Sequence, residues 1–221
     1  MYKLICFDLF FTLVKPEYYQ NPEYEIVGVS EKNWEAYMED YDLYIRRATG
    51  VITKPKEIIC EVLNKSNISL PDEKIDLLVK SRIDRFRNVL TNIESKVMQT
   101  LTCLKQFGIP MAVISNSDSI DVMYWEESPL YNFFIESVFS YKLGYVKPDK
   151  RIFTYLLKKL KIDASACLYI GDGGSYEIET ARHLGMKTVL VTHFSSYYSD
   201  TEADYKIGDF SKLLGIITEK N

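Results

Sequence analysis

The sequence has no long apolar run, no excess of basic residues, and no cysteine or histidine pattern typical of metal sites. A membrane-spanning helix needs about 20 consecutive apolar residues, and no segment of this chain approaches that length. The first residues show neither the long apolar stretch nor the small-residue cleavage site of a signal peptide. The 27 Lys and Arg residues are outnumbered by 31 Asp and Glu residues, for a net charge of −4, so there is no basic stripe for nucleic acid. We therefore expect no membrane partner and no nucleic-acid partner.

The four cysteines are scattered without CxxC spacing. Cys6 and Cys167 lie inside apolar runs, where a free cysteine behaves as a small core residue. The two histidines lie in different contexts and do not suggest a metal pair. Scattered cysteines are typical of reducing compartments, so we expect a cytoplasmic protein. No feature of the sequence points to a particular oligomeric state.

Short apolar runs recur along the chain and are typical of strands buried on both faces of a parallel sheet. We predict strands over residues 3–8, 110–115, 166–171 and 187–192, a weaker strand over 138–140 and a short last strand over 205–207. Between them, apolar residues repeat at helical spacing, which predicts helices over 95–107, 149–161, 175–184 and 210–217. This alternation indicates an α/β fold, a doubly wound parallel sheet with right-handed crossovers.

Residues 15–90 break the alternation, because they contain no convincing strand run. Apolar residues within Trp34–Ala48 mark one helical face, which ends at Gly50. Two further helices are predicted after Pro55 and Pro71, since proline is favoured in the first helical turn. This segment therefore reads as a helical insertion after the first strand.

The insertion divides the chain into two predicted domains. Residues 1–14 and 91–221 are expected to form the α/β core, and residues 15–90 the helical cap. The hinges are expected near Lys15–Pro16 and Leu90–Asn92. A cap over the sheet edge would exclude water and favour small substrates over polymers.

Four segments carry residues that suit one catalytic site. They are Phe7-Asp8-Leu9-Phe10-Phe11-Thr12-Leu13, Ile114-Ser115-Asn116-Ser117, Val146-Lys147-Pro148-Asp149 and Ile170-Gly171-Asp172-Gly173-Gly174-Ser175-Tyr176-Glu177. Ligands of open α/β sheets bind at the carboxyl ends of the strands, so Asp8, Ser115 and Asp172 are expected to lie together. A lone Asp after a strand is more often a loop or cap residue than a site residue. The occurrence of all four segments in order favours a site.

These segments resemble the four motifs of the haloacid dehalogenase superfamily, and the helical insertion resembles its C1 cap. The matching positions are Asp8-x-x-x-Thr12-Leu13, the run ending in Ser115-Asn116, Lys147-Pro148-Asp149 and Gly171-Asp172-x-x-x-x-Glu177. The resemblance implies a Rossmann-like core. It also implies a hydrolase that cleaves small phosphate monoesters through an aspartyl-phosphate intermediate.

The resemblance also implies a role for each matching residue. Asp8 would be the nucleophile, and Lys147 would supply positive charge beside it. The phosphate would be bound by Thr12, Ser115, Asn116 and Lys147. A Mg²⁺ cofactor, which prefers oxygen ligands, would be held by the side chains of Asp8 and Asp172, by the backbone carbonyl of Phe10 and, through a water molecule, by Glu177.

The sequence departs from this pattern at Phe10. Most phosphatases of the superfamily carry Asp two residues after the nucleophile, where it protonates the leaving alcohol and then activates water. Such acid–base help is typically worth about 10²–10⁴-fold in rate. Phe10 can do neither, and Phe11 replaces the usual small Gly.

Three interpretations follow from this departure. The first is a phosphatase in which a metal-bound water, a cap side chain or a good leaving group compensates for the missing acid. The second is a metal-independent 2-haloacid dehalogenase, with Arg46 or Arg47 binding the substrate carboxylate. Without a metal, however, Asp172 and Glu177 would repel Asp8, which favours the phosphatase. The third is a catalytically weak or non-enzymatic binding protein, since kinship of fold does not prove activity.

Five cap residues are candidates for substrate contact. They are Trp34, Tyr37, Tyr41, Tyr44 and Arg46. Packing between cap helices is the alternative explanation for each of them.

Overall fold

A six-stranded parallel sheet forms the centre of the protein, in a computed structural model that describes residues 2–218. The strand order is β3-β2-β1-β4-β5-β6, and every neighbouring pair is parallel. The strands are β1 (Leu4–Phe7), β2 (Met111–Ser115), β3 (Glu136–Phe139), β4 (Cys167–Gly171), β5 (Lys187–Val191) and β6 (Tyr205–Ile207). The predicted doubly wound α/β fold is confirmed.

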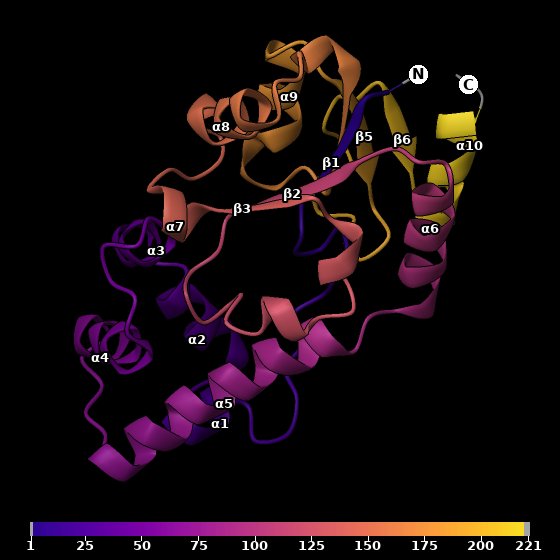
Figure 1. Cartoon of the computed structure of the whole chain (residues 1–221). Helices are drawn as coiled ribbons and strands as arrows, with labels where there is room; N and C mark the ends of the chain where they lie inside the picture. Colours follow the sequence, from indigo (N-terminus) through magenta and orange to yellow (C-terminus); the bar gives the residue numbers. More distant parts are fainter. Residues whose placement is uncertain (1, 219–221) are drawn as a thin grey trace.

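Helices cover both faces of the sheet (Figure 1). Alternate residues of β1 divide between two cores, as the period of two requires. Ile5 and Phe7 pack in the cluster that includes α6 (Ser95–Gln106) and α10 (Leu213–Thr218). Leu4 and Cys6 pack in the opposite cluster with α8 (Lys150–Leu160) and α9 (Glu177–His183). Both faces of this central strand are fully buried, which explains its unbroken apolar run.

The predicted cap residues form helices at the end of the sheet where the site residues lie (Figure 1). These helices are α1 (Glu23–Val27), α2 (Glu31–Met38), α3 (Tyr41–Ala48), α4 (Pro55–Lys65) and α5 (Asp72–Thr91). They share a separate core in which Trp34 is fully buried. The division of the chain at residues 15 and 90 stays a prediction.

Three predicted elements differ from the structure. The single helical face predicted within Trp34–Ala48 forms two helices, because Asp40 starts α3 by accepting a hydrogen bond from the Leu43 N–H at 3.3 Å. The helix predicted over 175–184 begins at Glu177, since Ser175 and Tyr176 have positive φ within a 3₁₀ turn. The helix predicted over 210–217 starts as a 3₁₀ turn over Phe210–Lys212.

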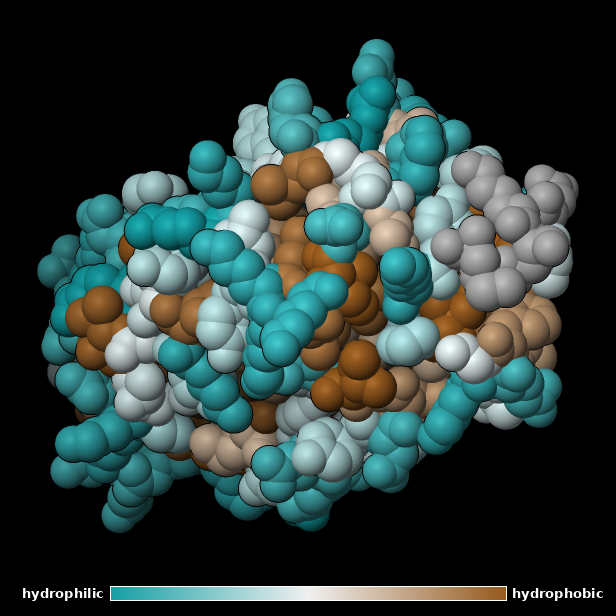
Figure 2. Space-filling view, turned by 45° about the horizontal axis from the view of Figure 1, so that its top comes forward, coloured by the Kyte–Doolittle hydropathy of each residue, from teal (hydrophilic) through white to brown (hydrophobic). Residues whose placement is uncertain are grey.

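Within residues 2–218, no helix is long and apolar enough to cross a membrane. Figure 2 shows an apolar area near the middle of one face, crossed and surrounded by hydrophilic side chains. Isolated apolar residues on a surface are normal for a folded domain.

Candidate active site

Asp8 follows the carboxyl end of β1 and starts a tight loop. The loop closes through hydrogen bonds from the N–H groups of Leu13 and Val14 to the Leu9 carbonyl, at 2.8 and 3.1 Å. Phe11 has a φ of 59°, a left-handed conformation that is unusual for a bulky residue. Its side chain remains 37% exposed. The loop thus holds a bulky aromatic ring at a position that favours glycine.

Lys147 lies at the centre of the site. Its Nζ donates to Asp8 Oδ1, to Glu177 Oε2 at 2.5 Å and to the Tyr169 hydroxyl at 3.4 Å. Burial disfavours the charged form, but the charges of Asp8 and Glu177 outweigh it and raise the pKa of Lys147. Lys147 is therefore a buried cation beside the predicted nucleophile.

Asn116 fixes the backbone of Lys147 from both sides. Its Oδ1 accepts from the Lys147 N–H at 2.7 Å, and its Nδ2 donates to the Lys147 carbonyl at 3.1 Å. Asn116 therefore positions the lysine, and its predicted phosphate contact stays a prediction. Thr12 and Ser115 are both fully buried. Thr12 Oγ1 donates to Asp8 Oδ2 at 3.1 Å, and Ser115 Oγ donates to the Asn116 carbonyl at 3.2 Å.

Asp8, Asp172 and Glu177 bring one carboxylate oxygen each within 4.8 Å of one another, and all three are buried. Burial raises the pKa of Asp172 to about 6 and that of Glu177 to about 8, and the charge of Asp8 adds to both shifts. Lys147 is the cation in contact with this group. One positive charge against three buried acids leaves a deficit that a divalent cation fits, and carboxylate oxygens are the ligands Mg²⁺ prefers.

Glycine is required next to this cluster. A Cβ on Gly171 would lie 1.9 Å from Glu177 Oε1, so any larger residue would displace that carboxylate. The Gly174 N–H donates to Asp172 Oδ1 at 3.0 Å and orients it. The predicted role of the Phe10 carbonyl as a metal ligand stays a prediction.

Tyr169 is a site residue that the sequence analysis missed. Its hydroxyl donates to Glu177 Oε2 at 2.8 Å and is fully buried in β4. Its position in the sequence gives one indication of this role, because a tyrosine with a polar hydroxyl lies inside an apolar strand, two residues before Gly171. Because Tyr169 and Lys147 both hold Glu177, this carboxylate is fixed in place before any metal binds.

A cavity of about 300 Å³ lies between the Asp8 loop and the helices of the predicted cap. Phe10, Phe11 and Asn116 line it from the core side. The remaining lining residues are Pro16, Tyr18, Glu35, Met38, Glu39, Tyr44, Arg47, Arg82, Arg85, Phe86 and Asp121. This cavity opens beside the loop that carries the predicted nucleophile.

Of the five predicted cap contacts, only Tyr44 lines this cavity. Trp34 and Tyr37 pack in the core of the cap helices, and Tyr41 is 75% exposed. Arg46 forms an ion pair with Glu61 at 2.7 Å. Packing or solvent exposure therefore explains the other four.

A buried ion cluster joins the cap helices to the loop after β2. Arg47 of α3 and Arg82 of α5 contact Asp118 at 2.8 and 3.1 Å, and Arg82 contacts Asp121 at 2.7 Å. Arg47 also donates to Glu39 at 2.9 Å. The sequence analysis missed this cluster. Since protein carboxylates occupy Arg47, the structure does not support it as a clamp for a substrate carboxylate.

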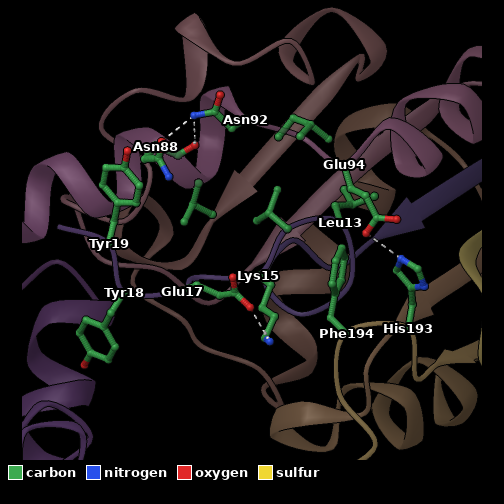
Figure 3. Close-up of a pocket in the computed structure, with 13 residues that line it drawn as sticks. Leu13, Lys15, Glu17, Tyr18, Tyr19, Asn88, Asn92, Glu94, His193 and Phe194 are labelled. Carbon is green, nitrogen blue, oxygen red and sulfur yellow. Dashed lines mark hydrogen bonds and ion pairs between the residues drawn. The ribbon is translucent and has the colours of Figure 1, made fainter. Parts of the chain in front are cut away.

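Residues of both predicted hinges line a second cavity of about 450 Å³ (Figure 3). Lys15 and Asn92 both line it, and the His193 Nε2–Glu94 Oε2 pair spans 2.9 Å at one side. None of the predicted catalytic or metal residues lines this cavity. It is therefore separate from the Asp8 site.

The model of the haloacid dehalogenase-like hydrolase family matches residues 2–185. The chain belongs to the haloacid dehalogenase-like hydrolases. The predicted family is confirmed, and the enzyme class is a hydrolase.

Curated relatives of this hydrolase include phosphatases. Glyceraldehyde 3-phosphate phosphatase of Methanocaldococcus jannaschii is 30% identical over 125 residues, which are 54% of this chain and 54% of that protein. Bifunctional epoxide hydrolase 2 of Mus musculus is 29% identical over 119 residues, covering 50% of this chain and 21% of that protein. The chain thus matches about half of the first relative and about a fifth of the second. Rhythmically expressed gene 2 protein of Drosophila melanogaster is 24% identical, with 89% of this chain and 85% of that protein covered.

Solved structures share the fold along nearly the whole hydrolase. A 2-haloacid dehalogenase from Pseudomonas syringae has a TM-score of 0.67 at 20% identity, with both chains fully covered. A family enzyme from Bacteroides thetaiotaomicron, in complex with magnesium and inorganic phosphate, also has a TM-score of 0.67, at 18% identity over 91% of this chain and 100% of that chain. At these identities the likeness shows the fold alone.

Proposed function

We propose that this hydrolase cleaves small phosphate monoesters, with Asp8 as nucleophile and Mg²⁺ as cofactor. The observation that carries the proposal is the buried group of Asp8, Asp172 and Glu177 around one lysine. A buried excess of negative charge is costly unless a cation or a proton balances it. A divalent cation provides that balance and suits a dianionic phosphate substrate.

Asp8 is the nucleophile of the proposed reaction. One carboxylate oxygen attacks phosphorus, the P–O bond to the leaving group breaks, and the phosphoryl group is carried on Asp8. Water then attacks phosphorus, which releases phosphate and restores the carboxylate. Lys147 neutralises charge beside the reacting oxygens, and Thr12 orients Asp8 Oδ2 through its hydroxyl.

The metal ligands would be Asp8, Asp172 and the Phe10 carbonyl, with Glu177 acting through water. Bound Mg²⁺ would supply positive charge against the phosphate oxygens. Titration calorimetry with Mg²⁺ alone tests this set without any turnover. Asp172→Asn should weaken binding at least about 10-fold, because it removes one charged ligand. Asp76→Asn, on the cap surface and paired with Lys56, should leave the affinity unchanged.

The activity test measures phosphate release from 4-nitrophenyl phosphate with Mg²⁺ and with a chelator. Turnover should require the metal and should be lost in Asp8→Asn, while Asp76→Asn keeps it. Release that persists in the chelator or in Asp8→Asn would overturn the proposal.

A 2-haloacid dehalogenase is the weaker candidate. Arg46 and Arg47 are occupied by protein carboxylates, and three acids close together do not suit a metal-free nucleophile. Chloride release from 2-chloropropionate in a chelator would favour that reaction. We expect none.

A further inference from the structure

The cavity between the Asp8 loop and the cap helices is lined by aromatic rings on the side of Phe10 and Phe11. The Phe10 ring packs edge-on against Phe86, with ring centroids 5.6 Å apart and an interplanar angle of 86°. Both rings belong to a cluster with Ile58 and Ile120. Phe11 extends the aromatic lining on the same loop. The side chains of Phe10, Phe11 and Phe86 therefore offer no proton to a departing oxygen.

Most polar groups that line the cavity are already engaged. Glu39 accepts from Arg47 at 2.9 Å. Asp121 accepts from Arg82 at 2.7 Å and from the Asp118 N–H at 2.9 Å. The lining arginines are held in the same way, by carboxylates or over aromatic rings. Apart from Glu35, the charged side chains of the lining are thus paired, and aromatic rings supply much of the rest, which suits an uncharged aromatic group.

Three further titratable groups line the cavity: Tyr18, Tyr44 and Glu35. Burial raises the pKa of Tyr18 to about 12, so its hydroxyl is a weak acid. Tyr44 carries a hydroxyl, but burial raises its pKa to about 12, with the charge of Glu39 adding to the shift, so it is a weak acid. Glu35 is exposed on α2. None of the three lies on the Asp8 loop.

We propose that the substrates of this site are aryl phosphates, whose leaving group departs without receiving a proton from the enzyme. This inference rests on the proposed phosphatase function. Asp8 forms the new O–P bond, and the aryl oxygen takes the electron pair of the breaking bond and leaves as an aryloxide. The aryloxide takes its proton from water after release. A phenol titrates at about pH 10, as the Tyr side chain does, whereas an aliphatic alkoxide is a far stronger base that needs a proton as it leaves.

The size of the cavity agrees with this class of substrate. About 300 Å³ lies at the lower end of the usual range for ligand pockets and accommodates one substituted ring. Aromatic rings prefer edge-on and offset contacts with one another. Phe10, Phe11 and Phe86 provide such contacts to an aryl group.

The experiment measures kcat/KM for phenyl phosphates substituted at the para position with nitro, chloro, hydrogen and methoxy groups. 2-Phenylethyl phosphate is the matched ester, since it keeps the ring and replaces the phenol by an alcohol. We expect kcat/KM to fall steadily as the phenol becomes less acidic. The phenylethyl ester should be slower than phenyl phosphate by about 10²-fold or more, the usual contribution of a general acid.

Phe10→Asp is the matched variant, because it places a carboxyl group on the Asp8 loop. In this variant kcat/KM should depend less on the acidity of the phenol. The ratio of kcat/KM for phenyl phosphate to that for 2-phenylethyl phosphate should also be smaller. If this variant does not fold, the dependence of kcat/KM on phenol acidity in the wild-type enzyme still tests whether the leaving group departs without a proton. Tyr44→Phe and Glu35→Gln should keep the wild-type slope, whatever they do to KM.

The outcomes separate the two proposals. Phosphate release with no dependence on phenol acidity, or equal turnover of the phenylethyl ester, would overturn the aryl-phosphate inference and leave the phosphatase standing. A steeper slope in Tyr44→Phe or Glu35→Gln would overturn it too, since that residue would then be the proton donor. Absence of phosphate release from every ester would instead overturn the proposed function.

Discussion

The ion cluster between the cap helices and the core predicts a large loss of stability in Asp118→Asn. Asp118 is fully buried. It accepts from Arg47 at 2.8 Å, from Arg82 at 3.1 Å, and from the N–H groups of Ile120 and Asp121 at 2.8 and 3.0 Å. An amide keeps the shape of the side chain but removes the negative charge between two buried guanidinium groups. Breaking a buried ion pair from one side costs about 3–5 kcal/mol.

We expect the lower end of that range, because Asp121 relieves part of the loss. The charge of Asp118 adds to burial in raising the pKa of Asp121 to about 6, so Asp121 ionises more readily once Asp118 is neutral. A loss of about 3 kcal/mol is a large share of the 5–15 kcal/mol that is typical of folded proteins.

Urea unfolding followed by tryptophan fluorescence measures this loss. Trp34 reports on the cap helices and Trp125 on the core. The control is Asp76→Asn, whose partner Lys56 is exposed, and it should change the free energy of unfolding by less than about 0.5 kcal/mol. A loss below about 1 kcal/mol in Asp118→Asn would refute the view that this cluster holds the two parts together.

Three further predictions follow from the same structure. Lys147→Met should lower kcat/KM for 4-nitrophenyl phosphate by at least about 10²-fold, because it removes the cation beside the nucleophile; a smaller effect in a folded variant would contradict that role. Gly50→Ala should destabilise the protein by about 1–3 kcal/mol more than Gly28→Ala in urea unfolding. A Cβ on Gly50 would lie 2.1 Å from the Tyr141 carbonyl oxygen, whereas a Cβ on Gly28 meets nothing within 4 Å. Equal losses of stability in the two variants would contradict this steric explanation. Burial and the charge of Asp118 raise the pKa of Asp121 to about 6, so protonation of Asp121 in the folded state contributes stability that is fully present below about pH 4 and is lost as the pH rises through 6. The difference in unfolding free energy between wild type and Asp121→Asn should therefore change between pH 4 and pH 7. A difference that stays constant over this range would refute the raised pKa of Asp121.

The sheet and its catalytic edge could be predicted from the sequence for a simple physical reason. Strands buried on both faces are nearly pure apolar runs, and parallel strands place their carboxyl ends at one edge. Asp8 and Asp172 follow two neighbouring strands, so their approach is a consequence of topology. The family motifs then pointed to Lys147 and Glu177, which the structure brings into contact.

Other features depend on contacts that sequence patterns do not encode. Arg47 and Asp118 are 71 residues apart in the chain, and nothing local distinguishes them from ordinary surface charges. The break at Asp40 depends on one capping hydrogen bond, which competes with a continuous helical pattern. Asn116 was assigned to phosphate from its motif, while its contact with the Lys147 backbone requires the folded loop.

The most direct test of the account is detection of a phosphoryl group on Asp8. The protein is mixed with Mg²⁺ and 4-nitrophenyl phosphate, quenched in acid during turnover, digested and analysed by mass spectrometry. We expect a peptide that carries one phosphoryl group at Asp8, and no such peptide from Asp8→Asn. Turnover without any phosphorylated Asp8 peptide, retained in Asp8→Asn, would contradict it.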